Sequence, residues 1–459
     1  MFRRVCTTLL LVFLAGCASH ADRLRQVRSA YYSGNVETAS IELDKYSREY
    51  RREAECCKMD RAVAELAAGR PKEAEKLLRE VRDALDYNSQ ASLAEKAGSM
   101  LTDDTHTAYA GEDYEKILVR AMLALSNLMS GGEDANAYAL QVGDLQEQII
   151  QAGADPSGKN PKLAYQRVAL GAYIHGALQE ANHLDFNDAA RSWAKVCSWE
   201  PAFPFGPGDV DRAMHGHHSQ RGNGVLYVFT LVGRGPYKVE VVEPASTISM
   251  FLATAIISPA ARHSLPPSIA PIKVPKVVVS PNPTASVQVS VDHRPAGTTA
   301  TITDVGRLAV EQYKAIYPQV VVRAVLRRAA KEAILYGAEE GLKKTAGNNS
   351  MTKFAIEVGG MLGGLAWQGS ESADCRCWGL LPERIQVLRV ELPAGTHRIG
   401  LRADAGFVPP ADQEKTVRID DGRNTYLLAT FADGRLIGNI LSSDAQEGQT
   451  PPVKLAQGR

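Results

Sequence analysis

Apolar side chains recur three and four positions apart through the first two hundred residues of the chain. Between residues 21 and 201 this spacing is carried by Ala and Leu, separated by Glu, Arg and Lys. Proline, which interrupts helices, is nearly absent before Pro156. The pattern predicts an α-helical domain over residues 17–202.

Four short blocks recur inside this domain. In each, a turn residue or its substitute stands five positions before an alanine; the blocks are residues 34–39, 69–74, 132–137 and 184–189. Glycine can end one helix, and alanine lets the next helix approach closely. The blocks resemble the tetratricopeptide repeat, whose period is about 34 residues. Because the later blocks are more widely spaced than the first two, the array is irregular, and a generic helical bundle stays open as the alternative.

The composition changes at Phe203. Residues 203–223 are rich in proline and glycine, and we interpret them as a linker. The β-branched and aromatic run 224–232 predicts a strand, and it opens a β-rich region that we expect over 224–303. A second helical pattern begins near Asp304 and predicts a helical segment over 304–372.

Strand-like patterns return in the last part of the chain, at residues 384–392, 396–402, 414–419 and 425–432. The Pro-Ala-Gly sequence at 393–395 predicts a tight turn that joins the first two strands as a hairpin. We expect an antiparallel β-sheet or sandwich over 373–442 and a flexible tail over 443–459. The predicted fold class is therefore multidomain α+β: tetratricopeptide-like helical repeats, a β-rich region with an inserted helical segment, and a C-terminal antiparallel β domain.

The N-terminal residues 1–18 predict the cellular compartment of the protein. Arg3 and Arg4 precede an apolar stretch at 7–14 that is too short to cross a bilayer. The sequence Leu-Ala-Gly at 14–16 followed by Cys17 resembles the lipobox of bacterial lipoproteins. This resemblance implies that residues 1–16 are a signal peptide and that Cys17 carries the lipid anchor. Ala18, which is not acidic, implies the outer membrane by the sorting rule of enteric bacteria, with the protein facing the periplasm.

Composition narrows the classes of partner. The 459 residues carry 52 basic and 52 acidic side chains, so the formal charge is zero. A nucleic-acid-binding surface needs concentrated positive charge, so we expect no nucleic-acid partner. The hydrophobic share of 45% excludes disorder for most of the chain.

Several segments together resemble a poorly characterised family of Gram-negative envelope lipoproteins with a tetratricopeptide-like N-terminal half. The resemblance is carried by residues 113–118, 123–128, 224–228, 236–240, 373–378, 381–386 and 392–397. It implies placement in the envelope and a scaffold role, and it supplies no catalytic residue.

Two clusters could carry other chemistry. The imidazoles of His215, His217 and His218 could bind a transition metal, but no acidic or thiol partner stands nearby at a recognisable ligand spacing, so we favour a solvated linker. Cys375 and Cys377 flank a cation beside an aromatic residue, and we favour a structural role over redox chemistry, metal binding or ligand binding. No hydrolase, phosphate-loop, dinucleotide or zinc-protease motif is present, so we expect neither catalysis nor a metal or cofactor.

Stacked helical hairpins leave a long groove that suits peptide or helix recognition. We expect a protein partner to contact side chains from the first helices of the hairpins: Tyr31, Tyr109, Tyr114, Arg120 and Tyr165. Three cations at helical spacing form a candidate contact for an anionic surface: Arg323, Arg327 and Lys331. Two apolar runs, 247–258 and 354–367, could pack inside the protein, enter a membrane or join copies of the chain.

The leading hypothesis is a lipid-anchored envelope scaffold that binds a protein partner through its helical repeats. The alternatives are a structural subunit of an oligomeric envelope assembly, which self-associates through the glycine-rich run, and a cell-wall-modifying enzyme.

Overall fold

The computed structural model describes residues 20–95, 108–154, 158–243, 272–321, 323–325, 372–405 and 413–444, with side chains except at 91–95. Cys17, both apolar runs, Arg327, Lys331 and the predicted tail from 445 onward lie outside these residues. No helix within the described ranges is both long and apolar enough to cross a bilayer.

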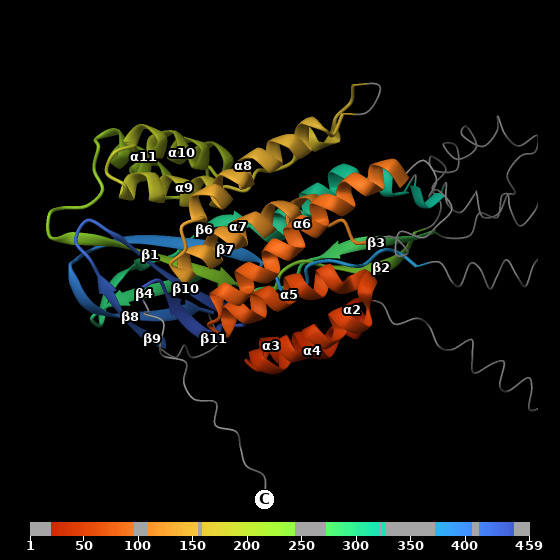
Figure 1. Cartoon of the computed structure of the whole chain (residues 1–459), viewed down its shortest axis with the longest axis horizontal. Helices are drawn as coiled ribbons and strands as arrows, with labels where there is room; N and C mark the ends of the chain where they lie inside the picture. The colour runs from red at the N-terminus through yellow and green to blue at the C-terminus, as the bar shows by residue number, and fades with distance from the viewer. Residues whose placement is uncertain are drawn as a thin grey trace, which may run out of the picture.

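Helices make up the first part of the described chain. They are α2 (His20–Arg23), α3 (Arg25–Tyr32), α4 (Val36–Glu49), η1 (Arg51–Glu53), α5 (Ala54–Ala67), α6 (Pro71–Glu95), α7 (Asp113–Ser130), α8 (Ala135–Gln151), η3 (Pro161–Ala164), α9 (Leu170–Ala181), α10 (Phe186–Trp199) and α11 (Gly206–Met214). From α3 onward, each α-helix packs against the next one in sequence. The resulting array runs from α3 and α4 at the bottom of Figure 1 to α10 and α11 at the upper left. The predicted helical N-terminal part is confirmed.

The predicted linker over 203–223 is wrong in its central part, which forms α11. Pro207 occupies the first turn of this helix, where the missing N–H has no intrahelical partner to lose. The carboxylate of Asp209 is buried and pairs with Arg212 at 2.8 Å. Proline and glycine therefore open a helix here and do not mark a flexible connection.

Strands make up the second part, which confirms the predicted β-rich region. They are β1 (Asn223–Val232), β2 (Tyr237–Glu243), β3 (Ile272–Val278), β4 (Ser286–Val291), β5 (Arg294–Thr298), β6 (Ala300–Asp304), β7 (Arg384–Pro393), β8 (Gly395–Asp404), β9 (Gln413–Ile419), β10 (Asn424–Ala432) and β11 (Arg435–Ser442). One sheet has the order β11-β10-β1-β7-β6, a second has β5-β4-β8-β9, and β2 and β3 form a separate antiparallel pair. In the five-stranded sheet only β1 and β10 are parallel. Residues 305–321 form a helix after β6, as the pattern from Asp304 predicts.

The predicted hairpin at 393–395 is wrong, because β7 and β8 belong to different sheets. β7 pairs with β1 and β6, whereas β8 pairs with β4 and β9. The turn carries the chain from one sheet to the other. Leu388 of β7 and Leu401 of β8 enter the same hydrophobic cluster from opposite sheets. A strand that changes sheet shows the same alternation of apolar and polar residues as a hairpin strand, so the sequence pattern cannot distinguish the two.

The five-stranded sheet is buried on both faces. Along β1, Tyr227 and Phe229 join the cluster that contains the helices, while Leu226 and Val228 join the cluster that contains the four-stranded sheet. This double burial explains why β1 is a continuous apolar run. The helices thus cover one face of the sheet, and the second sheet covers the other.

Candidate functional site

The inner face of the helical array, which faces the sheet, is crossed by an extended segment of the same chain. Residues 372–382, named here the inner segment, have no regular strand or helix, and from Cys375 onward every residue is buried. The N–H of Trp378 donates to Oε1 of Glu115 in α7 at 2.7 Å, and the N–H of Leu380 donates to Oδ1 of Asp60 in α5 at 2.7 Å. Two helix carboxylates therefore accept alternate main-chain N–H groups of the inner segment, where a strand partner would otherwise supply carbonyls.

A second contact fixes the start of the inner segment. The Arg376 guanidinium donates to both Asp374 oxygens, at 2.9 and 2.7 Å, and to the main-chain O of Arg52 at 2.9 Å. It also lies over the ring of Tyr109, 5.2 Å from the centroid. Burial acts to raise the pKa of the Asp374 carboxyl, but the hydrogen bonds and charge of Arg376 hold that pKa below its usual range. The segment is tied to the array by charge as well as by packing.

Burial changes the titration of the two carboxyls that bind the segment. It raises the pKa of Asp60 to about 6, against the opposing effects of Arg28 and the Leu380 N–H. It also raises the pKa of Glu115, together with the neighbouring carboxylate of Glu112, while Lys238 acts in the opposite direction. Both groups are fully buried, so their acceptor bonds to the inner segment are shielded from water.

The cysteines beside this segment are free thiols. Cys56, Cys57, Cys375 and Cys377 are all buried and unpaired by disulfides. Burial raises the pKa of Cys375 to about 12 and that of Cys377 to about 11. Such thiols carry almost no thiolate at neutral pH, so they are poor nucleophiles. Among the residues that the structure describes, no group of His, Cys, Asp and Glu is arranged to hold a metal.

The five residues predicted to face a partner are buried instead, with 1–7% of their surface exposed. The hydroxyls of Tyr109 and Tyr114 donate to Glu115, the hydroxyl of Tyr165 donates to Asp113, and Arg120 pairs with Asp86; Tyr31 is buried within the same core. The prediction of an exposed contact surface is wrong. The inner segment lies over Tyr109 and bonds to Glu115 beside Tyr114, while Arg120 and Tyr165 are paired with the nearby Asp86 and Asp113. Helical periodicity identifies a covered face but does not say what covers it.

The other predicted clusters are dispersed. His215 and His217 are exposed, whereas His218 is buried and bonded to Asn424 at 2.8 Å, so it is not part of a solvated linker. Arg323 is exposed in the helical residues 323–325.

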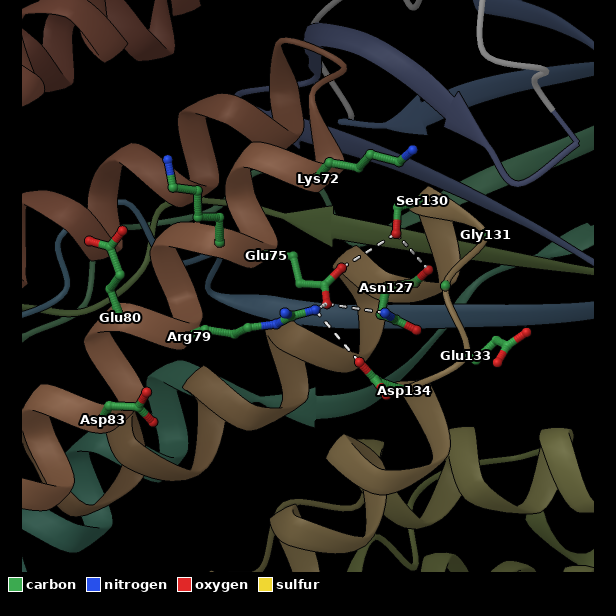
Figure 2. A pocket seen from close by; sticks show the side chains of 12 residues that line it. Lys72, Glu75, Arg79, Glu80, Asp83, Asn127, Ser130, Gly131, Glu133 and Asp134 are labelled. Atoms are coloured by element: carbon green, nitrogen blue, oxygen red, sulfur yellow. Dashed lines mark hydrogen bonds and ion pairs between the residues drawn. The ribbon is translucent and has the colours of Figure 1, made fainter.

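An open groove lies on the outer side of the array, between α6 and the turn from α7 to α8 (Figure 2). This outer groove has a volume of about 710 Å³. Its lining is polar: Lys72, Glu75, Lys76, Arg79, Glu80, Asp83, Asn127, Ser130, Gly131, Gly132, Glu133 and Asp134.

Glu75 forms the floor of the outer groove. Glu75 is 5% exposed, and its carboxylate pairs with Arg79 and accepts hydrogen bonds from Asn127 Nδ2 at 3.1 Å and from Tyr138 Oη at 3.3 Å. Arg79 also reaches Asp134 at 3.6 Å (Figure 2). Because Asn127 lies on α7 and Tyr138 on α8, these bonds join three helices at the floor of the outer groove.

The rim of the outer groove is exposed and carries both signs of charge. Lys76 lies on α6. Glu133 and Asp134 lie on the facing turn (Figure 2). Gly131 ends α7 with a left-handed φ of 68°, which glycine adopts without strain. The arrangement can recognise a polar, charged segment of a protein by complementary charge.

No protein-family model, curated protein or solved structure matches this chain.

Sequence reasoning missed Asp60, Glu75 and Glu115, which organise both regions. The one feature of the sequence that could have identified them is an acidic residue at a position where the helical pattern expects an apolar one. Asp60, between Met59 and Ala62, is an example. Such a residue marks a buried polar contact without naming the partner.

Proposed function

We propose that the chain is a lipid-anchored protein of the bacterial cell envelope that acts as a scaffold and binds a protein partner at the outer groove. The anchor is supported by the lipobox-like sequence that ends at Cys17. The choice of the outer groove is carried by one observation: the inner segment and the sheet cover the inner face of the array, while the groove along α6 is open. A partner of this site carries charges of both signs, to match Lys76 and the two rim carboxylates.

We further infer that the array consists of four tetratricopeptide-like hairpins. Support comes from the turns: α3–α4, α5–α6, α7–α8 and α9–α10 are joined through Gly34, Gly69, Gly131 and His183, which all have positive φ. A residue with left-handed backbone conformation after the first helix of each pair is expected if the hairpins are repeats of one unit. The shared hydrophobic cluster between the two sheets supports a β-sandwich as the platform on which the hairpins rest.

The groove can be tested by capturing partners from detergent-solubilised envelope. The test variant combines Glu133→Lys with Asp134→Lys, which reverses the charge of the rim. The matched control combines Asp188→Lys with Asp211→Lys, two exposed acidic residues on α10 and α11 outside the groove. We expect the wild type and the control to recover the same partner and the rim variant to recover several-fold less. Equal recovery by both variants would contradict the groove as the binding site.

The anchor needs a separate test. Cys17→Ser removes the thiol that takes the lipid, and we expect this variant to leave the membrane fraction while keeping the melting temperature of the wild type. An unchanged membrane fraction would contradict the proposed anchor.

A further inference from the structure

We propose that one end of the molecule lies directly on the lipid surface. This end, named here the basal end, comprises α2, η1, the open end of the β2–β3 pair and residues 317–321 and 323–325. The inference rests on the lipid anchor proposed above, and it adds which surface of the protein that anchor places against the bilayer.

The tether is short. Only Ala18 and Ser19 separate Cys17 from His20, the first residue of α2. Three steps between successive Cα atoms span at most about 11 Å, which is about the diameter of a single helix with its side chains. An acyl-bearing Cys17 therefore keeps α2 within about one helix diameter of the membrane surface.

The body is firmly attached where the tether begins. His20 is only 3% exposed, and its Nδ1 lies 2.7 Å from the carboxylate of Glu53 in η1. Arg23 of α2 pairs with the same carboxylate. These contacts bind α2 to η1, so α2 is part of the folded body. The short tether therefore determines which end of the whole protein lies near the membrane.

Further elements share the basal end. α2 contacts β2, and the β2–β3 pair opens where Glu243 faces Ile272. The helix that follows β6 packs on the same pair, since the hydroxyl of Tyr313 donates to the carbonyl of Pro275 and Val325 joins the cluster of Ile272. In Figure 1 the open end of β2–β3 and α2 lie towards the right of the described molecule, whereas the connection from α11 to β1 lies at its left end.

The exposed side chains of the basal end suit a lipid headgroup region. Val242 is 62% exposed at the open end of β2, and Arg51 and Arg323 are exposed on η1 and at residues 323–325. Apolar side chains enter the interfacial region of a bilayer, and arginines attract its anionic lipids. Arg25, the first residue of α3 next to the basal end, is also exposed but pairs with Asp22 at 2.5 Å, so its charge is partly satisfied within the protein.

Lipid quenching of fluorescent labels tests the proposal. The mature acylated protein, with Cys197→Ser to remove the half-buried thiol, is reconstituted into vesicles of phosphatidylethanolamine and phosphatidylglycerol that contain a headgroup nitroxide lipid. A fluorophore is attached through Arg51→Cys or Val242→Cys at the basal end. The matched control is Arg221→Cys, an exposed arginine in the connection between α11 and β1.

We expect several-fold stronger quenching at positions 51 and 242 than at 221, and no difference among the three without nitroxide lipid. Equal quenching, or stronger quenching at 221, in protein that floats with the vesicles would overturn the basal end as the lipid contact. Protein that does not float would overturn the anchor itself, which separates the two failures. Shielding of positions 51 and 242 that appears only after envelope proteins are added, without quenching by lipid, would show a protein contact at this end and overturn the proposal.

Discussion

The main-chain N–H of Trp378 bonds to the carboxylate of Glu115 although 263 positions separate the two residues in the chain. Glu115 stands on α7, in the middle of the helical array, whereas Trp378 belongs to the inner segment that leads into β7. The bond joins the first and last thirds of the sequence at a fully buried point. The helices and the β-rich part thus share one hydrophobic core, and over the residues that the structure describes the inner segment and the sheet cover the inner face of the array.

Loss of the Glu115 carboxylate should be costly. Besides Trp378, it accepts hydrogen bonds from the N–H of Glu112 and the hydroxyl of Tyr109. Glu115→Ala leaves these buried donors without an acceptor, so we expect the free energy of unfolding to fall by about 3 kcal/mol. Glu147→Ala is the control, because Glu147 is exposed on α8 and water screens its pair with Arg167, so we expect a much smaller loss of stability. Urea denaturation measures both, and equal losses would contradict a structural role for Glu115.

The titration of Asp60 gives a dependence of stability on pH. Burial raises the pKa of this carboxyl to about 6, so the folded protein binds its proton more tightly than the unfolded chain does. The contribution of this group to the free energy of unfolding therefore decreases as pH rises from about 4 to above 6, by about 3 kcal/mol in total.

Asp60→Asn keeps a carbonyl oxygen for the Leu380 N–H but cannot titrate. We expect the stability of this variant relative to wild type to increase across the same pH range and to level off above it. Denaturation at several pH values between 4 and 8 measures the difference. A difference that does not change with pH would contradict the raised pKa.

Substitution of a glycine tests the close packing of β11 on α5. Gly438 has a φ of 72°, and a Cβ at this position would collide with the main-chain O of Ala67. Gly34 also has a positive φ, of 89°, but nothing lies within 4 Å of the corresponding Cβ. Gly34→Ala should cost about 1 kcal/mol, the price of the left-handed backbone alone.

Gly438→Ala carries the same backbone strain and also pushes the helix from the sheet edge. We expect it to lower the free energy of unfolding by at least about 2 kcal/mol more than Gly34→Ala does. Thermal or urea unfolding of the two variants provides the comparison. Similar losses would mean that β11 and α5 are not in close contact.

The thiols report whether the inner segment stays in place. In the folded mature protein, iodoacetamide at pH 8 should modify Cys197 first, because it alone among the five described cysteines is not fully buried. Cys56, Cys57, Cys375 and Cys377 should react only after urea is added, since burial raises their pKa values and blocks access. Peptide mass spectrometry identifies the modified positions. Rapid modification of Cys375 or Cys377 without urea would indicate that the segment opens readily.

The sequence predicts the elements of this fold better than their arrangement. The run 224–232 predicts a strand, and β1 covers it, because β-branched and aromatic residues are informative on their own. The turn at 393–395 led to a wrong prediction of a hairpin. Apolar residues such as Leu388 and Leu401 alternate with polar ones along the two strands in the same way, whether the strands pair with each other or lie in different sheets. The sequence does not show that Tyr109 and Tyr114 are covered, because Arg376 and Trp378, which lie over Tyr109 and on the neighbouring Glu115, come more than 260 positions later in the chain. The outer groove depends on how α6 meets the α7–α8 turn, and local patterns contain no information about that distance.

The claim that the chain closes its own helical array rests on two main-chain amides. Hydrogen exchange at Trp378 and Leu380 tests it most directly, because the N–H groups of both residues are bonded to buried carboxylates. We predict that these amides exchange only through opening that approaches global unfolding, as the central strand β1 does. Exchange as fast as that of the exposed residues 215–217 would contradict the closed inner face. The inner groove would then again be a candidate site for binding a partner.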